Sequence, residues 1–146
     1  MDVSRGAQFA RLLLETFDAM TREVVEELAD AGHPGLTVTN ELAMEAIDDG
    51  AGNAASLARR LGVSRQAAAK TITALEGLGY VERAADADDA RRKSLCITAR
   101  GREAIAVGSA AFDRIRVRWE ATLGADRVAE TEDALRFLRD GVPEEK

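Results

Sequence analysis

The stretch Leu57-Ala-Arg-Arg-Leu-Gly-Val-Ser64 has the pattern of two short helices joined by a tight turn. Ala58 is small enough for close contact between the helices, and Gly62, four residues later, can adopt the left-handed backbone that the turn requires. Ser64 is a good N-terminal cap for a second helix over about residues 64–78. Together with a first helix over about residues 54–61, these features predict a helix-turn-helix.

The second helix of this motif has an apolar face and a polar face. The residues predicted to hold the two helices together are apolar: Leu57, Leu61, Val63, Ala68, Ile72 and Leu75. The residues predicted to face outward are polar or small: Ser64, Arg65, Gln66, Ala67, Ala69, Lys70 and Thr73. Glutamine can pair with adenine through two hydrogen bonds, and lysine or arginine can reach guanine or a phosphate. The outward face therefore suits the major groove of DNA, although taken alone such a face is more often only a solvated helix surface.

Two short strands are predicted after the helix-turn-helix, over residues 80–84 and 93–98, with a polar loop at residues 86–90 between them. The hairpin tip carries Asp89, Arg91, Arg92 and Lys93. Arginine at such a tip can enter the narrow minor groove, and Asp89 can hold the Arg91 guanidinium in place. The alternative is a solvated polar turn. Helix-turn-helix and hairpin together predict a winged helix-turn-helix over roughly residues 53–101.

Apolar residues recur at helical spacing on both sides of this region. They predict helices over about residues 4–30, 40–49, 99–123 and 127–140, capped in the last three cases by Thr39, Thr98 and Asp126. The predicted inward faces are Phe9, Leu13, Phe17, Met20, Val24 and Leu28 in the first helix; Leu42, Ala43, Ala46 and Ile47 in the second; Ile105, Phe112, Ile115, Trp119 and Leu123 in the third; and Val128, Leu135 and Leu138 in the last.

The predicted fold class is mainly α with a small β-hairpin wing (α+β). We expect an N-terminal dimerisation helix at residues 1–35, a winged helix-turn-helix DNA-binding domain at 36–101, and C-terminal dimerisation helices at 102–146. Dimerisation is expected because one reading helix contacts only a few base pairs. A two-fold dimer repeats the contact one DNA turn away.

The charge of the chain is unevenly distributed. The net charge is −6, but residues 1–55 carry −8, residues 56–102 carry +5 and residues 103–146 carry −3. The local field steers a protein onto phosphate, so the basic middle third fits a nucleic-acid partner. The N-terminal segment lacks the apolar run of a signal peptide, no stretch is apolar enough to span a membrane, and a single cysteine fits a reducing compartment. The cytoplasm is the expected location.

The sequence has no pattern that predicts an enzyme, a cofactor or a metal site. It holds no nucleophile–base pair, no glycine-rich phosphate loop and no cluster of metal ligands. The single histidine, His33, is expected to be a loop residue. The single cysteine, Cys96, is expected to point outward near Arg83 and Arg92; this allows a redox switch, but a small packing residue is the commoner case.

Several motifs resemble the MarR family of bacterial regulators: residues 57–64, Leu75-Glu-Gly-Leu-Gly-Tyr-Val-Glu-Arg83, Asp86-Ala-Asp-Asp-Ala-Arg-Arg-Lys93 and Leu95-Cys-Ile-Thr-Ala-Arg-Gly101. The resemblance implies a homodimer with interlocking terminal helices that binds a pseudo-palindromic operator and usually represses. It also implies release of DNA by a small aromatic compound or an oxidant. By position, Ser64, Gln66, Ala67 and Lys70 match the family's reading helix, and Asp89 and Arg91 match its wing. The run of alanines at residues 67–69 departs from the hydroxyl residues common there.

Three large side chains are candidates for an effector pocket between the terminal helices and the reading domain: Phe17, Met20 and Trp119. Their helical spacing is more often that of core residues. Two other functions remain open, a constitutive DNA-binding regulator without an effector and a winged-helix module that binds protein. The dependence of binding on salt distinguishes the protein-binding module from a DNA binder. For a DNA binder, the logarithm of the affinity falls linearly with the logarithm of the salt concentration.

Overall fold

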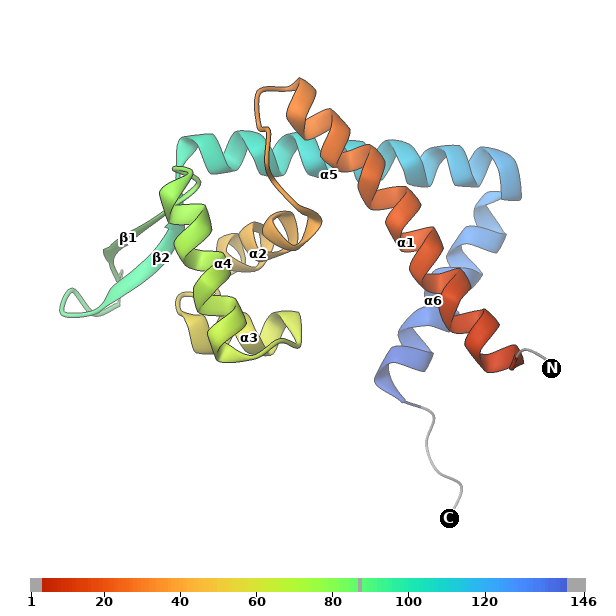
Figure 1. The fold of residues 1–146 in the computed structure, drawn as a ribbon, viewed down its shortest axis with the longest axis horizontal. Helices are drawn as coiled ribbons and strands as arrows, with labels where there is room; N and C mark the ends of the chain where they lie inside the picture. The colour runs from red at the N-terminus through yellow and green to blue at the C-terminus, as the bar shows by residue number, and fades with distance from the viewer. Residues whose placement is uncertain (1–3, 87, 142–146) are drawn as a thin grey trace, which may run out of the picture. The chain divides into compact units, whose positions relative to one another are not determined.

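The computed structural model describes residues 4–86 and 88–141. Within them the order of elements is the predicted one, four helices, a hairpin and two helices (Figure 1). The chain divides into two compact units, one ending at Ala111 and the other beginning at Phe112. The elements are α1 (Arg5–Asp30), α2 (Val38–Asp48), α3 (Ala54–Leu61), α4 (Arg65–Gly77), β1 (Val81–Ala85), β2 (Lys93–Ile97), α5 (Ala99–Leu123) and α6 (Ala125–Asp140).

The helix-turn-helix of α3 and α4 forms as the sequence predicts. Asn53 and Ser56 form a capping box that begins α3, and Gly62 ends it in the left-handed conformation, with φ of 65°. The Ser64 hydroxyl then accepts a hydrogen bond from the Ala67 amide, 3.0 Å away, and begins α4. The predicted contact residues Leu57, Ala58, Ala68, Ile72 and Leu75 are buried. The prediction was wrong for Val63, which is 40% exposed because it lies in the turn itself.

The hairpin extends from the end of α4 as a wing (Figure 1). Its two strands are antiparallel, with Arg83 opposite Leu95. The Leu95 amide also donates to the Gly52 carbonyl at 3.0 Å, which joins the wing to the loop before α3. At the end of β2, the Thr98 hydroxyl accepts a hydrogen bond from the Gly101 amide, so Thr98 caps α5 as predicted.

Two helix starts differ from the predictions. Thr37, not Thr39, caps α2, because Thr37 and Asn40 complete a capping box that places Val38 inside the helix. The α6 helix begins at Ala125 after Gly124, which has a φ of 91° and provides no side-chain cap, so Asp126 lies in the first turn instead of at the cap.

The inward face of α2 also differs from its predicted composition. Leu42 is 38% exposed, whereas Glu41 beside it is fully buried. Apolar residues recur on both sides of this short helix, so hydrophobic pattern alone does not determine which side lies against the rest of the fold.

The buried stripe of α5 consists mostly of small residues, which hydrophobic periodicity does not detect. These are Gly101, Ala104, Gly108 and Ala111, followed by Ile115. Of the predicted face, Ile105, Phe112 and Trp119 are only half-buried and Leu123 is 45% exposed. A β-carbon at Gly101 would overlap the Tyr80 carbonyl oxygen. Small residues therefore let neighbouring segments come close to the α5 backbone.

His33 lies in the loop after α1, as predicted, but its side chain is buried. Its Nδ1 is 3.1 Å from the hydroxyl of Tyr80, which is also buried. The Arg100 guanidinium donates to the same hydroxyl at 3.1 Å and lies 4.8 Å from the centre of the tyrosine ring. These contacts tie the loop after α1 to the end of the helix-turn-helix and the start of α5.

Both terminal regions expose large apolar side chains. On α1 only Val24 and Leu28 are buried, so the predicted stripe is uncovered over its first half. In the second unit, Arg116 of α5 pairs with Glu120 and with Glu132 of α6, and Val128 is buried, but Leu135 and Leu138 are exposed. Over the described residues, no helix has the length and apolar character needed to cross a membrane.

Candidate DNA-binding interface

The outward face of α4 is formed by the residues that the sequence predicts. Ser64, Arg65, Gln66, Ala67, Lys70 and Thr73 are all exposed, as is Ala69. Ala68, Ile72 and Leu75 are buried on the opposite side, where α4 packs on α3. Two of the outward hydroxyls have local roles: Ser64 caps the helix, and Thr73 donates to the Ala69 carbonyl at 3.0 Å. Arg65, Gln66 and Lys70 remain the long polar side chains on this face.

The wing brings the predicted basic residues to its tip. Asp89, Arg91, Arg92 and Lys93 are all exposed. The role predicted for Asp89 differs in one respect: its carboxylate accepts a hydrogen bond from the Arg91 main-chain amide at 3.0 Å, not from the guanidinium. An aspartate that binds the amide two residues later stabilises a tight turn. Asp89 therefore shapes the loop that carries Arg91. Ala87 lies outside the described residues.

Ion pairs within the protein use other cations of the basic segment. Arg60 pairs with Asp49 at 2.6 Å, Arg83 with Glu76 at 3.2 Å, and Arg102 with Asp48 at 3.3 Å. These three arginines hold the helices and the wing together. Of the seven remaining cations of the segment, five lie on α4 and the wing tip, whereas Arg59 lies on α3 and Arg100 on α5.

A polar hollow of about 460 Å³ lies beside the wing, and it is lined in part by residues that the sequence pattern does not predict as binding residues. Arg92 and Lys93 line it from the wing, and Asn53 and Ser56 line it from the start of α3. The capping pattern of Asn53 and Ser56 was the available signal, but it only indicates where a helix begins. Their position next to the two cations depends on the pairing of β2 with the loop before α3.

Cys96 does not have the surroundings that would favour a thiolate. Its Sγ lies 3.5 Å from the main-chain oxygen of Glu82, its partner across the hairpin, and the cation that acts on the thiol is Arg102, not Arg83 or Arg92 as predicted. Burial and the negative charge of Glu82 raise the pKa of the Cys96 thiol. A reactive cysteine requires the opposite shift.

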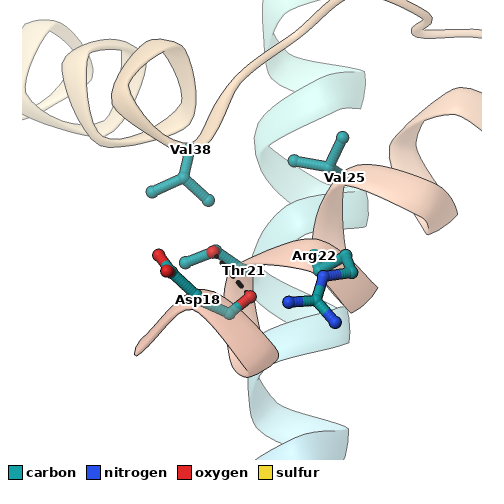
Figure 2. A pocket seen from close by; sticks show the side chains of 5 residues that line it. All are labelled: Asp18, Thr21, Arg22, Val25 and Val38. Carbon is teal, nitrogen blue, oxygen red and sulfur yellow. Dashed lines mark hydrogen bonds between the residues drawn. The ribbon is translucent and has the colours of Figure 1, made fainter. Parts of the chain in front are cut away.

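The candidate effector residues are separated between the two units. Phe17 is 48% exposed and Met20 half-buried on α1, while Trp119 is half-buried on α5 in the second unit. Another set of side chains surrounds a shallow hollow of about 300 Å³ in the first unit. Figure 2 shows four of them on α1 and the fifth opposite, at the start of α2: Asp18, Thr21, Arg22, Val25 and Val38. This hollow combines a cation, a carboxylate and two valines.

An outward polar helix held by a helix-turn-helix, followed by a basic hairpin, defines a winged helix-turn-helix protein. Residues 35–92 match the model of the MarR family. This match confirms, over residues 35–92, the resemblance to the MarR family that the sequence motifs indicated. No curated protein sequence matched it. Among the described residues, no group of histidine, cysteine and carboxylate side chains could hold a metal ion.

Solved structures of the same fold cover nearly the whole chain. CouR from Rhodococcus jostii RHA1, bound to p-coumaroyl-CoA, is 20% identical with a TM-score of 0.73, over 99% of this chain and all of CouR. PcaV from Streptomyces coelicolor, in complex with its natural ligand, is 22% identical with a TM-score of 0.72, over 97% of this chain and 98% of PcaV. A MarR-family protein of Mycobacterium tuberculosis, in complex with p-aminosalicylic acid, is 27% identical with a TM-score of 0.63, over 88% of this chain and 96% of the mycobacterial protein.

Proposed function

We propose that this protein is a homodimeric transcriptional regulator that binds a pseudo-palindromic operator and represses until a small aromatic ligand releases it. The exposed polar face of α4, opposite its buried contact with α3, carries the DNA-binding part of the proposal. In this proposal α4 enters the major groove, where Gln66 and Lys70 contact base edges, and the wing places Arg91 against the minor groove. Ser64, Arg65, Arg92 and Lys93 contact phosphates, while Ala67 and Thr73 lie close to the groove.

The operator can be obtained by selecting bound fragments from a random DNA pool. Two half-sites are expected with centres about 34–36 Å apart, since a two-fold dimer repeats its contact after one DNA turn. Binding should weaken linearly in log salt, with a slope near −0.9 for each phosphate contact. Failure to enrich any DNA would contradict the proposal and favour a winged-helix module that binds protein.

Substitution of the two central side chains tests base reading. Gln66→Ala and Lys70→Ala should each weaken binding to the selected operator by about 1–3 kcal/mol, because each removes hydrogen bonds to a base edge. Titrations of operator and random DNA at one salt concentration measure the effect. Arg127→Ala, which removes an exposed cation of α6, is the control and should bind as the parent does. Equal losses of affinity for random DNA would mean that Gln66 and Lys70 contact phosphates and not base edges.

The two units each expose a set of large apolar side chains, which supports dimerisation. On α1 these are Phe9, Leu12, Leu13, Leu14 and Phe17, and in the second unit Val117, Leu123, Leu135, Phe137 and Leu138, all between 43% and 61% exposed. Monomeric proteins rarely leave such contiguous apolar surface uncovered along a helix. A second copy of the chain is the partner that the family resemblance implies.

The ligand part of the proposal concerns the hollow beside Arg22. Arg22 can pair with a carboxylate, and Val25 and Val38 can contact an aromatic ring. The complexes of CouR with p-coumaroyl-CoA and of the Mycobacterium tuberculosis protein with p-aminosalicylic acid support a ligand with an aromatic ring. Phe17 and Met20, on the same helix, remain proposed contacts, and Trp119, which belongs to the second unit, stays an untested candidate.

Thermal unfolding in the presence of p-aminosalicylic acid tests this site. The ligand should raise the melting temperature of the parent in a concentration-dependent way, since it binds only the folded state. Arg22→Ala should lose most of this rise because the carboxylate loses its partner. Arg11→Ala, which removes an exposed cation from the same helix outside the hollow, should keep it. An equal rise in all three proteins would place the ligand elsewhere, and no rise with any aromatic acid would favour a regulator without an effector.

A further inference from the structure

Glu41 is a fully buried carboxyl group that the proposed DNA and ligand contacts do not use. It lies on the inner side of α2, is 0% exposed, and shares that helix with the buried apolar residues Met44 and Ile47. In the described part of the chain, neither carboxyl oxygen has a hydrogen-bond partner. A buried polar group without a partner costs free energy, so such a group calls for an explanation.

The Glu41 side chain lies at the contact between α2 and α5. Gly108 of α5 faces it so closely that a β-carbon there would lie 2.5 Å from Glu41 Cδ and would overlap its Oε1. One turn along α2, Glu45 accepts a hydrogen bond from the Ser109 hydroxyl at 3.3 Å. Two acidic side chains of α2 therefore meet two small residues of α5.

The surroundings of Glu41 favour its neutral form. Burial is the largest cause and the negative charge of Glu45 the second, and together they raise the pKa of Glu41 from 4.5 to about 7. The facing residues of α5, Gly108 and Ser109, carry no charge. Charged groups on the elements that pack on α2 include Arg102 of α5, paired with Asp48; Arg60 of α3, paired with Asp49; Glu76 of α4, paired with Arg83; the exposed Lys93 of β2; and the half-buried Glu23 and Glu27 of α1, both of which have interactions of their own.

We propose that Glu41 is a proton-controlled latch between α2 and α5. With the proton bound, the neutral carboxyl lets α2 lie against Gly108 without a buried charge. When the proton leaves for solvent, the carboxylate must be hydrated, and α2 moves away from α5 to admit water. The latch opens as the pH rises through neutrality.

The position of α2 gives this latch a route to the reading helix. The end of α2 is held on one side by the Arg102–Asp48 ion pair to α5 and on the other by the Arg60–Asp49 ion pair to α3. The α3 helix in turn packs on α4. A shift of α2 therefore displaces the helices that carry the exposed polar face. This regulatory consequence rests on the proposed DNA-binding function, whereas the latch itself does not.

The pH dependence of unfolding tests the latch without DNA. Between pH 4.5 and about 7 the folded protein keeps a proton that the unfolded chain has lost, so parental stability should fall as pH rises through this window and then level off. Glu41→Gln resembles the protonated side chain in shape and neutrality. It should melt at a higher temperature than the parent at pH 8 and should lack the parental fall between pH 5 and pH 7. Glu41→Met, which is neutral and apolar, should behave in the same way.

The matched control is Glu45→Gln, on the same helix. It removes a neighbouring negative charge but keeps Glu41, so the fall in stability should persist and move to lower pH. A fall of parental size in Glu41→Gln and Glu41→Met would overturn the latch.

Operator titration at pH 6 and pH 8, at constant ionic strength, tests the regulatory consequence. From pH 6 to pH 8 the affinity of the parent for the operator should decrease. This decrease should be at least severalfold larger than the decrease for Glu41→Gln. Equal decreases, with the expected unfolding behaviour, would overturn the coupling to the reading helix. Absence of operator binding by either protein at both pH values would contradict the proposed function, and the unfolding experiment would still decide the latch.

Discussion

A double variant, Phe9→Asp with Leu12→Asp, is expected to be a monomer and to bind the full operator about 10²–10⁴-fold more weakly than the parent. Both side chains are more than half exposed on α1, so the exchange should leave the folded monomer intact. In a dimer, the second reading helix binds at a high effective concentration once the first has bound. A monomer loses that advantage, and charged side chains at the proposed interface prevent the two copies from meeting.

Sedimentation and operator titration together check this expectation. The control is Phe9→Leu with Leu12→Met, which keeps both positions apolar and should remain a dimer of parental affinity. A DNA fragment with one half-site provides a second comparison, because the monomeric variant should bind it with the affinity of a single parental reading helix. A variant that stays dimeric, or one that is monomeric yet binds the full operator as the parent does, would contradict the proposed role of the terminal helices.

Leu75→Ala should destabilise the first unit by about 2–5 kcal/mol, the range for truncating a large side chain in a packed core. Leu75 is fully buried on the side of α4 opposite its outward polar face. The lost contacts should also loosen α4 on α3 and reduce operator affinity, although Leu75 itself does not touch DNA in the proposed complex. Chemical denaturation of the parent and the variant measures the change in the free energy of unfolding.

Leu78→Ala is the matched control for this truncation. It removes the same atoms three residues later, but Leu78 is 47% exposed, so the expected loss is below about 1 kcal/mol. Similar losses in the two variants would mean that the buried face of α4 does not carry the stability of the helix-turn-helix. A large loss of operator affinity in Leu78→Ala alone would instead place that end of α4 against DNA.

The helix-turn-helix and the wing could be predicted from the sequence because their signals are local. Gly62 in its left-handed conformation and the cap at Ser64 each act within a few residues. The outward face of α4 follows from helical spacing once Ala68, Ile72 and Leu75 are assigned to the interior. The wing tip was predicted less completely: the cations are exposed as expected, but the main-chain contact of Asp89 depends on the conformation of the loop.

Local pattern therefore determined, by itself, the order of elements, the winged helix-turn-helix and the exposed polar face of α4. Only the tertiary structure decided which side of each helix is covered and by what. It buried Glu41 instead of Leu42, brought Gly108 against that carboxyl, and joined Tyr80 to both His33 and Arg100. The physical reason is that desolvation and packing depend on residues far away in the chain, whereas caps, turns and helical spacing depend on near neighbours.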